Sequence, residues 1–168
     1  MRGRWDPWSR FCALVEDDLP TLVGLLADDV LGATREQLVD PLPQAYLDAF
    51  AAIGADPAHR LVVVEDGGEV VGMLQLSFIP GLTLQGGERA QVEGVHVAAD
   101  RRSRGIGAHL VAWAVEQAER RGSRLVQLTT NVQRTDAHRF YERLGFVPSH
   151  VGMKLALPRS GQGSSDHS

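Results

Sequence analysis

The chain predicts a single domain of mixed α+β (α/β) type, in which a mixed, mostly antiparallel sheet carries helices on both faces. Stretches with the alternation of half-buried strands follow stretches with the four-residue repeat of amphipathic helices. Two strand–helix–strand units with short loops indicate at least one parallel pair of strands, joined by right-handed crossovers. A strand–turn–strand stretch in the middle of the chain indicates antiparallel pairing beside it.

The first half of the chain predicts a hairpin preceded by a short strand and two helices. In chain order the expected elements are a strand at 11–15, a helix from 17 onward, a charged connection over 28–43, a helix at 44–53 and strands at 61–65 and 70–79. Asp17 or Asp18 is a suitable N-cap for the first helix, and Pro20 fits its first turn. Asp66-Gly67-Gly68 is typical of the tight turn of a hairpin.

The second half contains the most regular helix of the chain. Its expected elements are a strand at 89–97, a helix at 105–121, a strand at 125–130, a helix at 136–144 and a last extended segment at 146–157. The long helix has an apolar residue at every fourth position: Ile106, Leu110, Ala114 and Ala118. Gly122 would stop this helix, Thr135 would cap the next one, and Gly145 with Phe146 predicts a Schellman ending.

Composition places the chain among ordinary globular proteins. It has 168 residues and a formal net charge of −4, which argues against a nucleic-acid partner because such partners need a basic face. No apolar run approaches the about 20 residues of a membrane span, so no membrane partner is expected, and the charged start does not resemble a secretory signal. Cys12 is the single cysteine, which fits a reducing, cytoplasmic location.

The boundaries of the domain follow from composition. We expect a loose N-terminus over 1–8, one domain over 9–157 and a disordered, Gly/Ser-rich tail over 158–168. His96 and His138 have no partner at metal-ligand spacing, and no Ser-His-Asp arrangement is apparent, so we expect no metal. A homodimer is compatible with the sequence, which leaves the oligomeric state open.

The sharpest local signal is a turn rich in arginine and glycine between an expected strand and the long helix. It reads Arg101-Arg102-Ser103-Arg104-Gly105-Ile106-Gly107-Ala108. Glycines at the mouth of a helix let the backbone turn tightly and let a ligand approach the free N–H groups of the first turn. The helix macrodipole and the arginines add positive potential, so the turn predicts a site for a phosphate or diphosphate. A glycine-containing loop with solvated arginines is the plain alternative.

Two common nucleotide-binding motifs do not fit this turn. A Walker loop requires a lysine directly after its last glycine, and no lysine follows Gly107. A Rossmann fingerprint requires a third glycine where this chain has Leu110, and it would lie near the first strand of the fold.

Arg102-x-x-Gly105-x-Gly107 resembles the Arg/Gln-x-x-Gly-x-Gly/Ala motif of the Gcn5-related N-acetyltransferases, which lies between a strand and the long third helix. The resemblance continues outward from this motif. Val95-His96-Val97 resembles the strand end that precedes it, 125–131 resembles the adjacent strand, and 137–146 is similar to the following helix with its Phe-Tyr-x-x-x-Gly-Phe ending. The resemblance covers roughly 14–157, and its specific motifs lie in the second half.

The resemblance implies the fold of that family, with a splayed pair of parallel strands, and acetyl-CoA as the co-substrate. The strand end would hold the pantetheine arm by its main chain, and the turn would bind the diphosphate. The residues implied to contact the cofactor are Val95, His96, Val97, Arg102, Ser103, Arg104, Gly105, Ile106, Gly107, Ala108, Asn131, Ala137 and Tyr141. Asn131 has an equally weighted alternative as a loop residue that caps a turn.

Acetylation of an amine requires a proton acceptor, because an alkylamine has a pKa of about 10.4. Glu93 is the best candidate, directly or through one water, and a surface-facing glutamate is its alternative. Regular alternation in the strand at 89–97 would put Glu93 on the face of Val95 and opposite His96. Glu88, in the preceding turn, is a weaker candidate.

The proton that the leaving thiolate needs would come from Tyr141, a role that the resemblance implies. A packed core tyrosine is the alternative for this residue. The sequence therefore favours an N-acetyltransferase whose acceptor is a small-molecule amine or a peptide amine. Two rival functions stay open: a non-catalytic acyl-CoA-binding sensor of the same fold, and an unrelated phosphate- or nucleotide-binding module.

Overall fold

A computed structural model describes residues 14–28 and 32–157. In chain order its elements are η1 (Glu16–Asp18), α1 (Leu19–Ala27), α2 (Gln44–Ala55), β1 (His59–Asp66), β2 (Glu69–Ile79), α3 (Thr83–Gly86), β3 (Arg89–Val97), η2 (Ala99–Arg101), α4 (Ile106–Arg121), β4 (Leu125–Leu128) and α5 (Thr135–Arg143). The chain forms two compact units, one ending at Thr130 and one beginning at Asn131.

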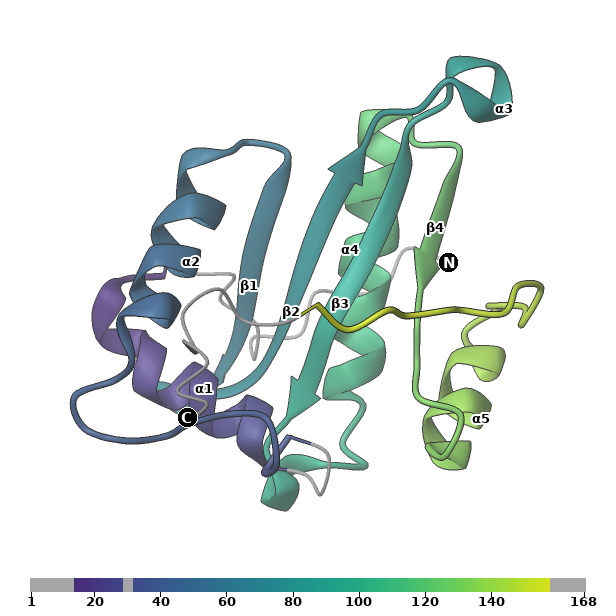
Figure 1. The fold of residues 1–168 in the computed structure, drawn as a ribbon. Coiled ribbons are helices and arrows are strands. Elements are labelled where there is room, and N and C mark those ends of the chain that lie inside the picture. Colours follow the sequence, from purple (N-terminus) through teal and green to yellow (C-terminus); the bar gives the residue numbers. More distant parts are fainter. Residues whose placement is uncertain (1–13, 29–31, 158–168) are drawn as a thin grey trace, which may run out of the picture. The chain divides into compact units, whose positions relative to one another are not determined.

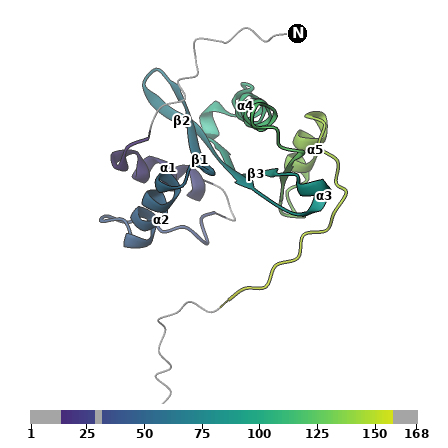
Figure 2. The same cartoon turned by 90° about the horizontal axis from the view of Figure 1, so that it is seen from above.

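The first unit is built on a sheet with the strand order β1-β2-β3-β4 (Figure 1). β1, β2 and β3 pair antiparallel, and β3 pairs parallel with β4. Helix α4 covers one face of this sheet, and α1 and α2 cover the other (Figure 2). The expected mixed sheet, with its parallel pair and helices on both faces, is therefore confirmed.

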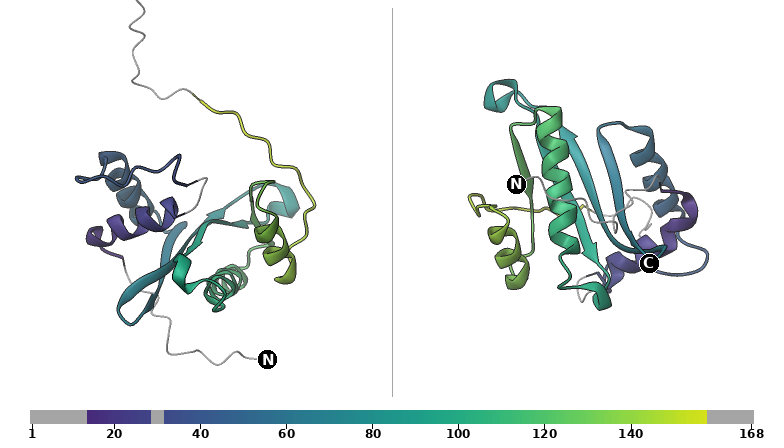
Figure 3. Two further views of the ribbon diagram at one scale, coloured as in Figure 1. Left: turned by 90° about the horizontal axis from the view of Figure 1, so that it is seen from below. Right: turned by 180° about the vertical axis from the view of Figure 1, so that it is seen from behind.

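Each face of the sheet has its own apolar core. The buried residues on the α4 side are Val62, Val64, Val71, Leu74, Leu76, Phe78, Ala90, Val92, Leu110, Ala114 and Ala118. The buried residues on the other side are Leu19, Leu22, Leu25, Val63 and Met73. The four-residue repeat of the long helix thus lies against the sheet as predicted, and Figure 3 shows α4 running along this face.

Helix α4 is fixed at both ends by glycines with positive φ. Gly105 is its N-cap at φ 85°, and Gly122 is its C-cap at φ 82°, where the N–H of Gly122 donates to the carbonyls of Ala118 and Glu119. Near its start the helix approaches β2 closely, because a Cβ on Gly72 would lie only 3.1 Å from Ile106. This close approach sets the position of the glycine turn against the sheet.

Strand β3 contains an irregularity that the alternation pattern did not predict. Gly94 has a φ of 57°, and the pairing with β2 shifts between the pairs Gln75–Glu93 and Met73–His96. Val92 and Val95 consequently both pack on the α4 side, although three positions separate them. The expectation that Glu93 shares a face with Val95, opposite His96, is wrong, since Glu93 and His96 both pair with β2 residues of the other face.

The second unit contains α5 and the chain after it. The N–H of Phe146 donates to the Tyr141 carbonyl and that of Gly145 to the Glu142 carbonyl, with Gly145 at φ 92°. The rings of Tyr141 and Phe146 meet edge to face, with centroids 5.9 Å apart. These contacts confirm the expected Schellman ending. Residues 147–157 form no helix or strand.

Several expected boundaries differ from the observed ones. Leu14 and Val15 lie in no strand, and the remainder of the strand expected at 11–15 lies outside the described residues. β4 ends at Leu128 instead of Thr130. Arg134 is the N-cap of α5, and Thr135 is its first residue instead of its cap. The expected termini at 1–8 and 158–168, and Cys12, also lie outside the described residues.

Candidate functional site

The glycine turn presents unpaired backbone N–H groups. The first main-chain bond of α4 is donated by His109 to the Gly105 carbonyl, and no described group accepts from the N–H groups of Ile106, Gly107 or Ala108. Ser103 and Gly105 both have positive φ, at 65° and 85°. Left-handed residues before a helix turn successive N–H groups toward one side, which forms an anion-binding concavity. The turn therefore has the backbone geometry of a diphosphate site.

The three arginines of the turn differ in what they bind. Arg101 lies in an acidic group, with its Nε 3.5 Å from Asp66, its Nη2 3.9 Å from Glu69 and its Nη1 bonded to Asp100. Arg102 also bonds to the protein itself, at the Asp28 carboxylate and the Val97 carbonyl. Arg104 is exposed and makes no hydrogen bond or ion pair with the described residues. Of these arginines, Arg104 is the one whose guanidinium is available to an anion.

The end of β3 extends past its parallel neighbour. The last residue pair between the two strands is Val92–Leu128, and Glu93–Val97 continue beyond it. Val95 lies beyond this last pair, and the Val97 carbonyl accepts from Arg102 Nε at 3.1 Å. This early end of the pairing fits the splayed strands that the resemblance implied.

Glu93 and Glu88, the two candidate bases, have different surroundings. Glu93 is exposed and lies opposite Gln75 on β2, and its carboxylate makes no hydrogen bond or ion pair with any described residue. Glu88 is held by its neighbours, because Arg121 Nε donates to both of its carboxylate oxygens at 3.0 Å and Ser123 donates to one of them at 3.0 Å. The structure thus leaves the Glu93 carboxylate available and gives Glu88 a structural role.

Polar side chains accompany Glu93 on the sheet face opposite α4. Gln91 lies between Ser77 on β2 and Gln127 on β4 in the register. The Gln127 Nε2 donates to the Gln91 Oε1 at 2.7 Å, and both side chains are half-buried. Residue alternation places this pair on the Glu93 face, so polar side chains from β3 and β4 gather there.

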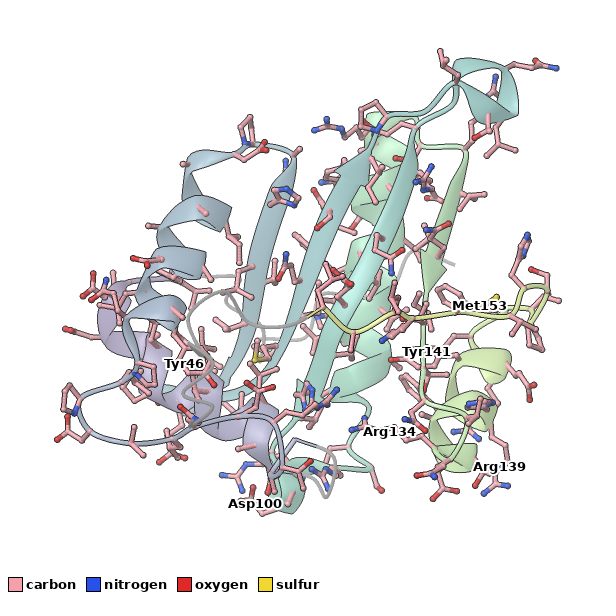
Figure 4. The ribbon with its side chains drawn as sticks, in the orientation of Figure 1. Tyr46, Asp100, Arg134, Arg139, Tyr141 and Met153 are labelled. Atoms are coloured by element: carbon pink, nitrogen blue, oxygen red, sulfur yellow. The ribbon has the colours of Figure 1, made fainter. Side chains whose placement is uncertain are left out.

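In the second unit, Tyr141 lies on α5 (Figure 4) and is half-buried. Its ring contacts that of Phe140, with the ring centroids 5.0 Å apart. Burial raises the pKa of its hydroxyl, and the nearby positive charge of Arg134 partly offsets this rise. The phenol is therefore protonated at neutral pH, which a proton donor requires.

Asn131 and Ala137, also in the second unit, were expected to contact the cofactor. The Asn131 side chain accepts from the N–H of Gln133 at 2.9 Å, and its carbonyl bonds to His138 Nε2 at 2.9 Å. Asn131 therefore caps a turn, which was the alternative given for it. Ala137 is half-buried in α5 and has no polar side-chain atom. His138 serves this same turn.

One Ser–His–Asp series was not apparent in the sequence. His59 Nδ1 lies 2.8 Å from Ser77 Oγ, and its Nε2 lies 3.7 Å from Asp56. The second distance is too long for a hydrogen bond, and Ser77 is only 4% exposed. A buried hydroxyl cannot attack a substrate, so we interpret these residues as a cross-strand contact of β1 and β2.

A shallow hollow of about 710 Å³ lies beside α1 in the first unit. Its lining residues are Pro20, Thr21, Gly24, Leu25, Ala27, Asp28, Leu38 and Ala98. Within the described ranges, no group of His, Cys, Asp and Glu side chains could hold a metal ion. The described helices also include none that is long and apolar enough to cross a membrane.

Comparison with known proteins decides the family. The profile of the acetyltransferase (GNAT) family matches residues 6–146. The chain belongs to this family. An aminoalkylphosphonate N-acetyltransferase from Salmonella typhimurium strain LT2 is 39% identical over 131 residues, which cover 77% of this chain and 84% of that protein. The GNAT chain described here is thus an acetyltransferase by family.

Solved structures agree with the family assignment. A protein from Bacillus halodurans C-125, described as a transcriptional regulator, is 49% identical with a TM-score of 0.86, and the match covers 89% of this chain and 99% of that one. A candidate acetyltransferase from Agrobacterium tumefaciens strain C58 is 30% identical with a TM-score of 0.76, over 88% and 99% of the two chains. The mixed sheet of this GNAT chain therefore recurs in relatives of clear sequence similarity.

Proposed function

We propose that this GNAT chain transfers the acetyl group of acetyl-CoA to the primary amine of a small molecule. The observation that carries the proposal is the start of α4, where the N–H groups of Ile106, Gly107 and Ala108 have no described acceptor behind the left-handed Gly105. Such a helix start binds a diphosphate by its N–H groups and its dipole. Arg104 adds a charge that no described carboxylate neutralises.

The cofactor site consists of the turn and the strand end. Ser103–Ala108 hold the diphosphate, and the main chain of Val95 and His96 pairs with the amides of the pantetheine arm. The support is that the pairing of β3 with β4 ends at Val92–Leu128, before these two residues. Bound acetyl-CoA supplies the acetyl group as an activated thioester. Holding the amine beside that thioester is the main source of rate.

Glu93 acts as the general base. It takes a proton from the ammonium group of the acceptor, directly or through one water, so that the nitrogen has a free lone pair. Its exposure and its lack of partners among the described residues support this role. Glu88, the weaker candidate for the base, is bonded to Arg121 and Ser123.

Tyr141 acts as the general acid. Its protonated hydroxyl gives a proton to the sulfur that leaves when the amide bond forms. The raised pKa of this hydroxyl supports the role, since the proton stays on the oxygen until it is needed. A thiolate leaves without help at a lower rate, so loss of Tyr141 slows the reaction without abolishing it.

The acceptor is a short aminoalkyl compound. This proposal rests on the Salmonella typhimurium relative, whose name gives aminoalkylphosphonates as its substrates. It also agrees with the polar face around Glu93, where the carboxylate and glutamine side chains offer acceptors to an ammonium group.

A panel of amines tests the function. The purified chain is incubated with acetyl-CoA and, in turn, aminoalkylphosphonates, aminoglycosides, amino acids and a peptide with a free N-terminus, and released CoA thiol is measured. We expect turnover with the aminoalkylphosphonates to exceed that of the other classes. No thiol release above the rate without amine, for any class, would contradict the enzymatic function.

Glu93→Gln tests the base. Turnover should fall most at low pH, where the amine is hardest to deprotonate, and the deficit should narrow as the pH approaches the amine pKa of about 10.4. Glu88→Gln is the matched control, because it removes a carboxylate that lies directly before β3 and that Arg121 already binds. A constant ratio of variant to parent rate across the pH range would exclude Glu93 as the base.

A second candidate function is an acyl-CoA-binding regulator. The Bacillus halodurans relative, at 49% identity, is described as a transcriptional regulator, and this description favours a regulatory function as the second candidate. A regulator would bind acetyl-CoA in calorimetry without turning over any amine of the panel. The two candidates are therefore separated by comparing binding with thiol release.

A further inference from the structure

We propose that Asp28 is a positioning residue for acetyl-CoA, which acts through Arg102 to hold the glycine turn in its binding shape. The proposal rests on the proposed function, because it assumes that the turn binds the diphosphate of acetyl-CoA. Asp28 lies directly after α1, far from the turn in sequence. We name Asp28 and Arg102 together the α1 clamp.

The α1 clamp ties three segments of the chain together. Arg102 Nη2 donates to the Asp28 Oδ2 at 3.0 Å and to the Asp28 carbonyl at 3.1 Å. Arg102 Nε donates to the Val97 carbonyl at 3.1 Å, at the end of β3. The Asp28 Oδ2 also accepts from the N–H of Ala99 at 3.1 Å, at the start of η2. The end of α1, the end of β3 and the start of the turn are thus joined at one arginine.

The residue after Arg102 explains why the turn needs such a support. Ser103 has a φ of 65°, a left-handed conformation that a residue with a Cβ adopts only at an energetic cost. A strained residue of this kind persists when its surroundings hold it in place. Since Arg102 is fixed on one side of Ser103 and α4 begins after Gly105 on the other, the clamp fixes the direction in which the N–H groups point.

Charge supports a positional role for Arg102. Its guanidinium is bonded to a carboxylate and two carbonyls, so it contributes less positive potential to a diphosphate than an unpaired arginine does. The sequence-based prediction that Arg102 contacts the cofactor stays a prediction, because these bonds already occupy its guanidinium. Arg104 is left to interact with the anion.

The position of Asp28 also suggests a competing role, in binding the acceptor amine. Asp28 also lines the hollow beside α1 and Ala98, where a carboxylate could attract an ammonium group of the acceptor. The positioning role needs a hydrogen-bond acceptor at this place, whereas the attraction of an ammonium group needs a negative charge. Both the Ala99 and the Arg102 bonds go to the same oxygen, Oδ2, so an asparagine amide oxygen can accept both of them, but it carries no charge.

This difference defines the experiment. Acetyl-CoA affinity is measured by calorimetry, and kcat and both KM values by thiol release, for the parent, Asp28→Ala, Asp28→Asn, Arg102→Ala and the double variant Asp28→Ala/Arg102→Ala. We expect Asp28→Ala and Arg102→Ala each to weaken acetyl-CoA binding by about five- to tenfold, as the loss of charge-assisted hydrogen bonds between half-exposed groups implies. Asp28→Asn should restore most of the affinity.

The other readouts follow from the same geometry. The KM for acetyl-CoA should rise with the dissociation constant, while kcat and the KM for the amine stay within about twofold of the parent. The double variant should bind no more weakly than the weaker single variant, because the two residues form one unit. Glu116→Ala is the matched control, since it breaks an exposed carboxylate–arginine pair with Arg120 farther along α4 and should leave acetyl-CoA binding unchanged.

Three results would overturn the proposal. If Asp28→Asn binds acetyl-CoA as weakly as Asp28→Ala, the hydrogen bonds that Oδ2 accepts do not hold the turn. If the KM for the amine rises instead of the KM for acetyl-CoA, Asp28 serves as a charge for the acceptor and not as a positioning residue. Additive losses in the double variant would show that Asp28 does not act through Arg102. A parent chain that does not bind acetyl-CoA would instead reject the proposed function, so the two failures are distinguishable.

Discussion

At the scale of single residues, the arginines around the glycine turn show how much the partners of a charge matter. Arg101 forms ion pairs with Asp66 and Asp100, Arg102 is bonded to Asp28, and Arg104 has no described partner. A count of basic residues in the sequence therefore overstates the positive potential that an anion meets. The potential that remains comes from Arg104 and from the start of α4.

Arg104→Glu should weaken acetyl-CoA binding by at least about tenfold, or about 1.4 kcal/mol, because the new carboxylate repels the diphosphate. Calorimetry with acetyl-CoA measures the effect. Arg60→Glu makes the same change of net charge on β1, where Arg60 bonds to Gln117, and should leave the affinity near that of the parent. Equal losses in the two variants would point to net charge and not to a site at the turn.

The raised pKa of Tyr141 leads to a measurable titration. The chain has two tyrosines, Tyr46 and Tyr141, so a Tyr46→Phe variant reports Tyr141 alone by its ultraviolet absorbance. The midpoint should lie above the ordinary value of about 10 because burial disfavours the phenolate. A midpoint at or below 10 would contradict the burial of this hydroxyl.

The same shift has a consequence for stability. Since the folded pKa exceeds the unfolded one, the stabilisation is fully present below about pH 10 and is lost as the pH rises through the folded value. Tyr141→Phe should remove this part of the alkaline loss in melting temperature.

At the scale of elements, the bulge at Gly94 decides which side chains reach which face. A substitution that disfavours its positive φ should disturb both the strand and the site. Gly94→Ala should lower the free energy of unfolding by about 1–2 kcal/mol, because a Cβ there meets no closer neighbour than Leu26 at 3.9 Å and the left-handed backbone is the main penalty.

Denaturant unfolding measures the effect of Gly94→Ala, and acetyl transfer should fall as well. Gly54→Ala is the control, because Gly54 lies in α2 with open space around it and no positive φ. Alanine is a better helix former there and should be neutral or stabilising. An equally mild effect of both substitutions would mean that the bulge does not depend on Gly94.

The elements also show which sequence signals are reliable. The long helix was predicted closely because Gly105 and Gly122 mark its ends and its apolar repeat faces one layer. The faces of β3 were predicted wrongly beyond Gly94, since alternation assumes a regular strand and a glycine in a strand is compatible with either outcome. Thr135 was expected to cap α5, but the helix includes it.

At the scale of the whole molecule, ligand binding should be visible as stability. Acetyl-CoA or CoA at about 100 times its dissociation constant adds about 2.7 kcal/mol, which raises the melting temperature of a chain of this size by about 5–10 °C. ATP and NAD at the same concentration should give smaller shifts. A response to ATP or NAD without one to CoA would favour the rival phosphate- or nucleotide-binding module.

Those features of the whole molecule that depend on a pattern within one segment of the sequence were predicted correctly. The mixed sheet, its parallel pair and the acetyltransferase family followed from the order of elements and from the motifs at 102–107 and 137–146. The partners of Arg102 and Glu88 were not predictable, because Asp28 and Arg121 come from distant positions and no local pattern marks a contact between them. Sequence motifs thus indicated the cofactor better than the contacts that support its site.

The bulge at Gly94 divides β3 into two parts whose side chains serve different faces of the sheet. Gln91 and Glu93, before Gly94, lie on the polar face, and Val95 and Val97, after it, pack against the core under α4. If the proposed function holds, substitutions at 91 and 93 should change the preference for the acceptor without altering the packing of Val95 and Val97. A redesign of the acceptor preference of this enzyme should therefore vary positions 91 and 93 and keep Gly94.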